Sequence, residues 1–81
     1  MRYHTATITI YNIDESYQLV QELLHRFAKN ICLRVGYPVE GKKTAIIFLI
    51  LKMTNDRLGA LSGKIGQLDS VQIKTTSLKI N

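Results

Sequence analysis

The side chains that could bind a metal ion are few in this sequence. Its 81 residues include one cysteine, Cys32, and two histidines, His4 and His25. A thiolate and two imidazoles suit a soft metal, but soft-metal carriers use paired thiolates. Free cysteine is usually buried, so we expect Cys32 to be a small buried side chain. We expect His4 to lie near a frayed N-terminus, and His25 to lie at the border of the polar face of a helix. We therefore predict no metal and no cofactor, with a metal sensor as a minor alternative.

Catalytic side chains are equally dispersed. Ser62 has neither a nucleophile elbow nor a neighbouring base, and the carboxylates form no pair. An acylphosphatase-like phosphate site would need a glycine-rich anion cradle and an arginine after the first strand. Residues 12–15 are instead acidic and contain no glycine. We predict that the protein is not an enzyme.

The best candidate for a ligand contact is Arg34 with Gly36. They stand two residues apart in an alternating segment, so they share one face of a strand. An arginine can bind a carboxylate or another anion through two hydrogen bonds, and a glycine leaves room for the ligand to approach. If the apolar residues of this segment face the helices, the pair faces away from them, with Asn12 and Asp14 on the neighbouring loop. The alternative is an interfacial salt bridge or a solvated arginine.

The element that must position these residues is an unbroken apolar run. Residues 44–51 contain one polar side chain, Thr44, and lack the alternation of a strand with one face in water. The run predicts a central strand with both faces buried. It is too short to cross a bilayer as a helix, which takes about 20 apolar residues.

Periodicity also predicts the remaining elements. They are strands over 3–11, 31–37 and 71–76, and helices over 15–29 and 55–66. Pro38 is expected to close the second strand and Gly66 to end the second helix in a left-handed conformation. Gly59 and Gly63 lie four apart on that helix, which favours a close approach to its backbone, because each weakens the helix by about 1 kcal/mol relative to alanine.

The predicted order is strand, helix, strand, strand, helix, strand. Two right-handed βαβ halves then interleave as a four-stranded antiparallel sheet with two helices on one face, and the first and third strands lie at the centre. The fold class is α+β, a ferredoxin-like βαββαβ sandwich, in one domain over residues 1–81. Two helices can cover only one face of the sheet. We expect a second copy of this short chain to cover the other face, in a dimer or tetramer.

The charge pattern permits an anionic partner without requiring one. The net charge is +5, and no basic run is longer than Lys42-Lys43. RNA binding on the open sheet would need several aromatic residues on the central strands, and the third strand has only Phe48. The N-terminus has no pattern typical of a signal peptide, so we expect a cytoplasmic protein that does not associate with membranes.

Three separated blocks of sequence resemble a known family. They read Arg34-Val35-Gly36-Tyr37-Pro38-Val39, then Ala45-Ile46-Ile47-Phe48-Leu49, and then Asn55-Asp56 followed by Gly59-Ala60-Leu61-Ser62-Gly63-Lys64-Ile65-Gly66-Gln67. In this order they resemble the small ACT-like proteins termed iron-only hydrogenase system regulators, over nearly the whole chain. The resemblance implies an ACT-like, ferredoxin-like fold akin to the C-terminal domain of the nickel-responsive repressor. It also implies a homo-oligomer with a transcriptional or hydrogenase-maturation role.

Two related patterns are incomplete in this chain. Amino-acid-binding ACT domains resemble Asp-x-x-Gly-x-Leu after the first strand, but Tyr17 stands at the glycine position here. The histidines do not reproduce the spacing of the nickel regulator's metal site, and nothing resembles a DNA-reading helix or arm, so direct DNA binding is not expected without a partner. We predict a regulatory protein that binds a small ligand or partner in a crevice at a subunit interface. A structural interaction subunit without a ligand is the alternative.

Overall fold

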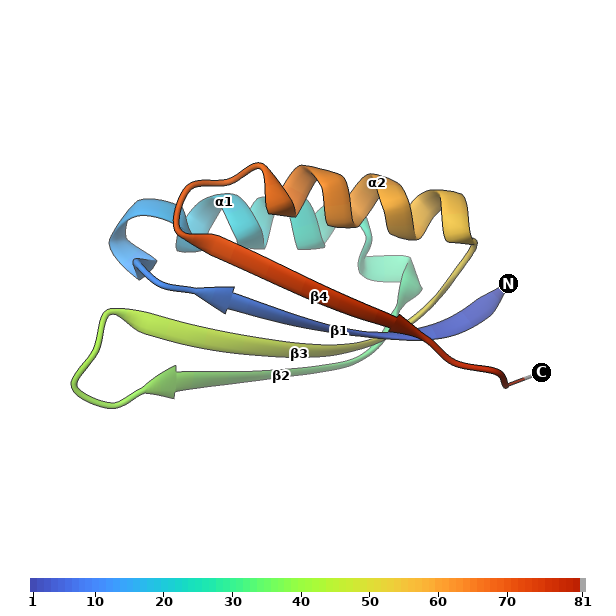
Figure 1. Cartoon of the computed structure of the whole chain (residues 1–81), viewed down its shortest axis with the longest axis horizontal. Coiled ribbons are helices and arrows are strands. Elements are labelled where there is room, and N and C mark those ends of the chain that lie inside the picture. The colour runs from blue at the N-terminus through green and yellow to red at the C-terminus, as the bar shows by residue number, and fades with distance from the viewer. Residues whose placement is uncertain (81) are drawn as a thin grey trace.

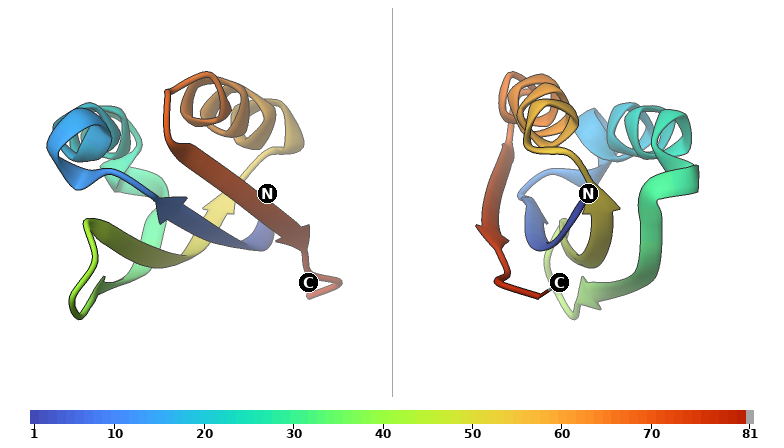
Figure 2. Two further views of the ribbon diagram at one scale, coloured as in Figure 1. Left: turned by 60° about the vertical axis from the view of Figure 1, so that its left-hand side comes forward. Right: turned by 90° about the vertical axis from the view of Figure 1, so that its right-hand side faces the viewer.

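The computed structural model describes residues 1–80 and contains a four-stranded antiparallel sheet with two helices on one face (Figures 1 and 2). The elements are β1 (Arg2–Ile10), α1 (Ile13–Arg26), the 3₁₀ turn η1 (Ala28–Asn30), β2 (Ile31–Val39), β3 (Thr44–Met53), α2 (Asn55–Gly66) and β4 (Val71–Ser77). The strand order is β2-β3-β1-β4, which confirms the predicted fold and its two central strands. Asn81, the last residue of the domain predicted over 1–81, lies outside the described residues.

The hydrophobic core lies between the sheet and the helices. Alternate residues of β1 and β3 point into it, as the period of two in a strand requires. From the other side, the helices contribute an apolar stripe at helical spacing. The largest fully buried apolar side chains are Ile8, Ile10, Val20, Leu24, Leu49, Leu51, Met53, Leu61 and Ile65.

The single chain buries only one face of β3. Leu49 and Leu51 are fully buried under the helices, whereas Phe48 points to the open face of the sheet and is 38% exposed. The strand is central, but the prediction that both of its faces are buried does not hold within one chain. Both helices lie on the same side of the sheet, so none of the described elements covers the other face (Figure 2).

A β-bulge at Cys32 reverses the predicted orientation of β2. Ile31 pairs with Leu51, but Leu33 pairs with Ile50, so the register shifts by one residue between them. Directly paired residues of an antiparallel ladder share a face. Leu33 therefore faces the open side, and Arg34 lies on the helix side. The prediction that Arg34 and Gly36 face away from the helices is wrong, because alternation from Ile31 does not continue through a bulge.

Four smaller predictions also fail. Cys32, expected to be buried, is exposed at the bulge. Pro38 lies within β2, paired with Ala45, and an edge strand tolerates a residue that cannot donate to a ladder. Gly66 is the last residue of α2, but its φ is not positive, and the C-cap residue Gln67 is also in a right-handed conformation. An added Cβ on Gly59 or Gly63 would meet no atom within 4 Å, so no described part of the chain approaches α2 there.

His4 is a structural residue, not part of a frayed terminus. It is fully buried on β1. Its Nε2 lies 3.0 Å from the carbonyl oxygen of Met53 on β3, and its Nδ1 lies 2.9 Å from the Ser77 hydroxyl on β4. A carbonyl can only accept, so Nε2 carries a proton and donates it to Met53, and in the neutral imidazole Nδ1 accepts from the Ser77 hydroxyl. The imidazole thus joins three strands at one end of the sheet.

Replacing His4 with alanine should destabilise the fold strongly. The change removes both hydrogen bonds, leaves the Met53 carbonyl without its partner and opens a cavity, so we expect a loss of about 2–4 kcal/mol in the free energy of unfolding. His25→Ala, at the exposed histidine of α1, is the control and should stay within about 0.5 kcal/mol of the parent. Urea unfolding followed by circular dichroism measures both. Equal stabilities of the two variants would contradict the role of His4.

Candidate functional site

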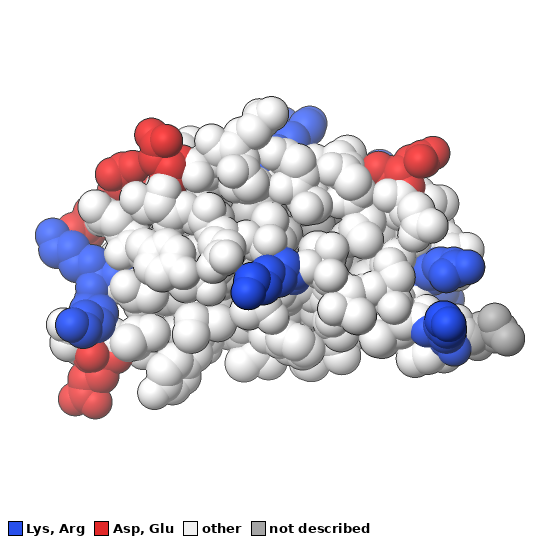
Figure 3. All heavy atoms as spheres, in the orientation of Figure 1, with Lys and Arg blue, Asp and Glu red and all other residues white. Residues whose placement is uncertain are grey.

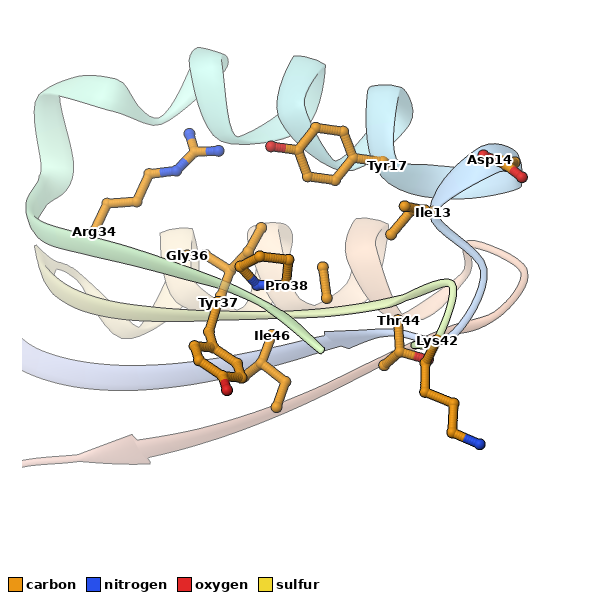
Figure 4. A pocket seen from close by; sticks show the side chains of 12 residues that line it. Ile13, Asp14, Tyr17, Arg34, Gly36, Tyr37, Pro38, Lys42, Thr44 and Ile46 are labelled. Atoms are coloured by element: carbon orange, nitrogen blue, oxygen red, sulfur yellow. The ribbon is translucent and has the colours of Figure 1, made fainter. Parts of the chain in front are cut away.

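The main cavity is an open cleft of about 600 Å³ between α1 and the β2–β3 hairpin (Figure 4). Its lining residues come from the first turns of α1 and from both strands: Ile13, Asp14, Tyr17, Arg34, Gly36, Tyr37, Pro38, Lys42, Thr44, Ala45, Ile46 and Ile47. The volume lies within the range of about 300–1,000 Å³ that is typical of small-molecule sites. The cleft lies on the helix side of the sheet.

The cleft exists because α1 does not extend over the edge strand. On β3, Ala45, Ile47 and Leu49 are buried, whereas Arg34 and Gly36, which pair with Leu49 and Ile47, remain exposed. Helix α1 therefore covers β3 and leaves the helix-side face of β2 open. The bulge at Cys32 decides which residues of β2 stand on this face.

The walls of the cleft are mainly apolar. Ile13 and Tyr17 contribute from α1, and Pro38, Ala45 and Ile47 contribute from the hairpin. Tyr17 projects from α1 into the cleft, with its hydroxyl toward Arg34 (Figure 4). The cleft therefore offers an apolar body with polar groups at its ends.

Tyr37 and Ile46 differ from the other residues around the cleft. Their side chains point away from it, toward the open face of the sheet (Figure 4). Tyr37 is 62% exposed there. These two residues therefore contribute mainly backbone to the cleft wall.

Arg34 provides the positive charge at one end of the cleft. Its guanidinium group turns toward α1 and donates a hydrogen bond to the side-chain oxygen of Gln21 (Figure 4). Within residues 1–80, no carboxylate lies within ion-pair distance of Arg34. Its partner is a neutral amide, so the arginine keeps an uncompensated charge.

Gly36 provides open space beside Arg34. A Cβ built on Gly36 would meet no atom within 4 Å. The absence of a side chain therefore leaves the floor of the cleft accessible. The glycine is not required by backbone geometry, because its φ is not positive.

Asp14 lies at the other end of the cleft and is paired. Its carboxylate is 2.9 Å from the Lys43 ammonium group, and both side chains are largely exposed. The hydrogen bond to Asp14, and then its negative charge, raise the pKa of Lys43 above 10.5. Acidic and basic residues gather at the end of the molecule that carries the hairpin loop, on the left of Figure 3. Asp14 and Lys43 thus place one negative and one positive group at the mouth of the cleft.

Asn12 is the one predicted site residue that does not line the cleft. It stands at the N-cap position of α1, where its side chain makes no capping hydrogen bond. Its Oδ1 atom is buried and has no hydrogen-bond partner among the described residues. The structure therefore brings Arg34, Gly36 and Asp14 to one cavity and leaves Asn12 beside it.

Sequence reasoning missed the wall that α1 contributes. Ile13, Tyr17 and Gln21 recur every four residues, which places them on one face of α1, next to β2. In the sequence, Tyr17 stands out only as the residue at the glycine position of the ACT-domain pattern. Its 39% exposure shows that it lies at the border of the core. The spacing of four was the available signal.

A smaller hollow of about 430 Å³ lies on the other side of Arg34, lined also by Gln21 and His25. Among residues 1–80, no three side chains of His, Cys, Asp or Glu come together as a metal site would require. Neither helix is long and apolar enough to cross a membrane.

Comparison with known proteins now adds a family. The family model TM1266-like, described as "Iron-only hydrogenase system regulator, putative", matches residues 2–75. The chain belongs to the TM1266-like family. The match covers α1, the hairpin and every residue of the cleft, and the family description is that of a regulator, not of an enzyme.

Two solved structures are similar to this TM1266-like chain. The uncharacterized protein TM1266 from Thermotoga maritima is 51% identical, with a TM-score of 0.92 over 96% of this chain and 98% of that one. A dimeric ferredoxin-like protein from an uncultured marine organism is 8% identical, with a TM-score of 0.52 over 100% of this chain and 99% of that one. The second likeness shows the ferredoxin-like fold alone. No curated protein matches the sequence.

The pairing of Asp14 with Lys43 can be tested by titration. Asp14→Asn should lower the pKa of Lys43 toward 10.5, because the neutral amide no longer favours the charged ammonium. Since the folded-state pKa is the raised one, any stabilisation by the pair is present below pH 10.5 and is lost as the pH rises through that pKa. NMR of the lysine Nζ groups measures the shift, with Lys42 as the internal control. An unchanged Lys43 pKa would contradict the pairing.

Proposed function

We propose that this protein is a regulator in the iron-only hydrogenase system, acting on transcription or on hydrogenase maturation. It works as a homo-oligomer that binds a small ligand in the cleft. The family supplies the regulatory role, and two surfaces of the structure support the mechanism. One surface is the open face of the sheet, and the other is the cleft on the opposite face.

The observation that carries the proposal is an apolar patch on the open face. The patch consists of Leu33, Val35 and Tyr37 on β2 and Ile46, Phe48 and Ile50 on β3, and we call it the β2–β3 patch. Its members form three directly opposed cross-strand pairs. Leu33, Val35, Tyr37 and Phe48 are 38–62% exposed. Contiguous apolar patches of this kind mark interaction sites on soluble proteins.

A second copy of the chain is the partner that fits this patch. Strand spacing and rise give the whole open face of the sheet a footprint of about 20 Å by 30 Å, and the β2–β3 patch occupies about half of it. A two-fold axis through the patch would stack the apolar halves of two sheets. The remaining half, on β1 and β4, carries four threonines, Gln72 and Lys74, and would stay outside the contact. The ferredoxin-like neighbour from the marine organism is described as dimeric, which is consistent with self-association of a chain with this fold.

Strand β2 links the patch to the cleft. Arg34 and Gly36 face the cleft, while Val35 and Tyr37, between and beside them, face the patch. A ligand that holds the cleft side of this edge strand also restrains its patch side. Ligand binding would then shift the balance between assembly states by its different affinity for each.

This mechanism explains how a chain of this size acts without a DNA-reading element of its own. Strands β2 and β3 separate the two helices in sequence, so α1 and α2 do not form a helix-turn-helix. The regulatory output therefore passes to a partner protein through the state of assembly. DNA contact would come from that partner.

Charge on the β2–β3 patch should prevent assembly. Val35→Glu and Phe48→Glu each place a carboxylate within the proposed interface, where no basic residue of the patch can pair with it, so we expect at least a 100-fold weaker association. Leu19→Glu is the control, because Leu19 is 46% exposed on α1, away from the patch. Size-exclusion chromatography with light scattering measures the mass of each. A parent protein that is monomeric at high micromolar concentration would refute the assembly.

Native mass spectrometry of untagged protein, purified without oxygen, separates the sensor from a structural subunit. The proposal predicts an oligomer with an additional small mass on part of the population. An oligomer of bare chains from every preparation would favour the purely structural module. A bound metal would favour the metal sensor instead.

A further inference from the structure

We infer that the cleft binds a small organic monoanion with an apolar, planar body, such as an aromatic carboxylate. This inference rests on the proposed function, because it names the ligand of the same site. Three features of the cleft support it: the environment of Arg34, the composition of the walls and the charges at the mouth.

Arg34 can replace its hydrogen bond to Gln21 with a stronger one to an anionic ligand. The guanidinium group donates to the neutral amide oxygen of Gln21, and no carboxylate within residues 1–80 pairs with it. A charge-assisted bond to a carboxylate is about twice as strong as a bond between neutral groups, and a carboxylate can accept two parallel bonds from one guanidinium. A carboxylate ligand would therefore displace the amide. The displaced Gln21 amide would then form hydrogen bonds with water.

The walls select an apolar body for this anion. Ile13, Pro38, Ala45 and Ile47 are apolar, and the Tyr17 ring projects from α1 into the cleft (Figure 4). Gly36 adds no side chain to the lining on β2, so the space between the Tyr17 ring and the hairpin can take a planar group. Aromatic rings pack favourably in an offset stack.

The charges at the mouth oppose a ligand with more than one negative charge. Lys43 is engaged by Asp14, and the Lys42 side chain points away from the cleft (Figure 4). Asp14 itself would repel a second negative group. Arg34 is thus the one cation of the lining that turns into the cleft, and one cation matches one negative charge. For phosphate or a larger dianion, the cleft offers no second cation. Phosphate also has no apolar part to contact the walls.

Benzoate and its neutral analogue benzamide test the charge requirement. Titration of ¹⁵N-labelled protein should give saturable NMR shifts at residues 34–38 and 45–47 with benzoate, and at least ten-fold weaker binding of benzamide. Inorganic phosphate should bind more weakly than benzoate. Equal binding of benzoate and benzamide, tighter binding of phosphate, or no shift with any probe would overturn the inference.

Variants of the cleft test its location. Arg34→Gln should weaken benzoate binding at least ten-fold, and Arg34→Lys should restore only part of it, because lysine keeps the charge without the fork. Gly36→Val should fill the slot and weaken binding to the same extent. Gly59→Val is the matched control, because a Cβ there also meets no atom within 4 Å but lies on α2, so benzoate binding should be unchanged. Full affinity in either Arg34→Gln or Gly36→Val would place the ligand elsewhere.

The same titrations separate this inference from the proposed function. If benzoate binds as described but assembly never responds to it, the ligand class stands and its coupling to assembly fails. If the chain assembles through the β2–β3 patch but binds no probe, the inference fails and the assembly stands.

Discussion

A sheet has two faces, and in this molecule the helices cover only one of them. The hydrophobic effect buries the apolar stripe of each helix against the sheet. Both crossovers between strands have the same handedness, so both helices lie on the same face. Strand β3 is apolar on both faces, so its second set of side chains remains in contact with water in the single chain. The β2–β3 patch, and with it the proposed assembly, follows from this imbalance. Within residues 1–80, no element lies over the patch.

The bulge at Cys32 decides which side chains of β2 lie on each face of the sheet. It keeps Ile31 against the core and then turns Leu33, Val35 and Tyr37 to the open face. Without the extra residue, the three apolar side chains would enter the space of the cleft, and Arg34 would lie on the open face. One inserted residue therefore places Leu33, Val35 and Tyr37 in the β2–β3 patch and Arg34 and Gly36 in the cleft. β-bulges often reorient side chains beside functional sites in this way.

The position of β2 at the edge of the sheet completes the site. An edge strand has only one neighbouring strand. Here α1 covers β3 and leaves the helix-side face of β2 open. Arg34 can then reach α1 across open space, and Gly36 leaves that space unfilled. The hairpin end brings Asp14 and Lys43 to the mouth. The cleft is thus a consequence of incomplete coverage, as the patch is.

Much of this was predictable from residue patterns. The element order, the central position of the apolar strand and the cap of α2 at Thr54, whose hydroxyl accepts from the Arg57 amide, depend on local periodicity and capping chemistry. The choice of Arg34, Gly36 and Asp14 as residues of interest also came from their types and positions. Three of the four residues chosen line one cleft.

The orientation of these residues was decided by the tertiary structure. Alternation along β2 predicts the wrong face for Arg34, because a bulge is a property of the pairing between two strands and leaves no mark in the local pattern. The buried role of His4 likewise depends on Met53 and Ser77, which are 49 and 73 residues away in sequence. The sequence by itself determined which elements form and which of their faces are apolar. Contacts between distant strands decided which face meets the helices, because burial is a property of the packed layers and not of one segment.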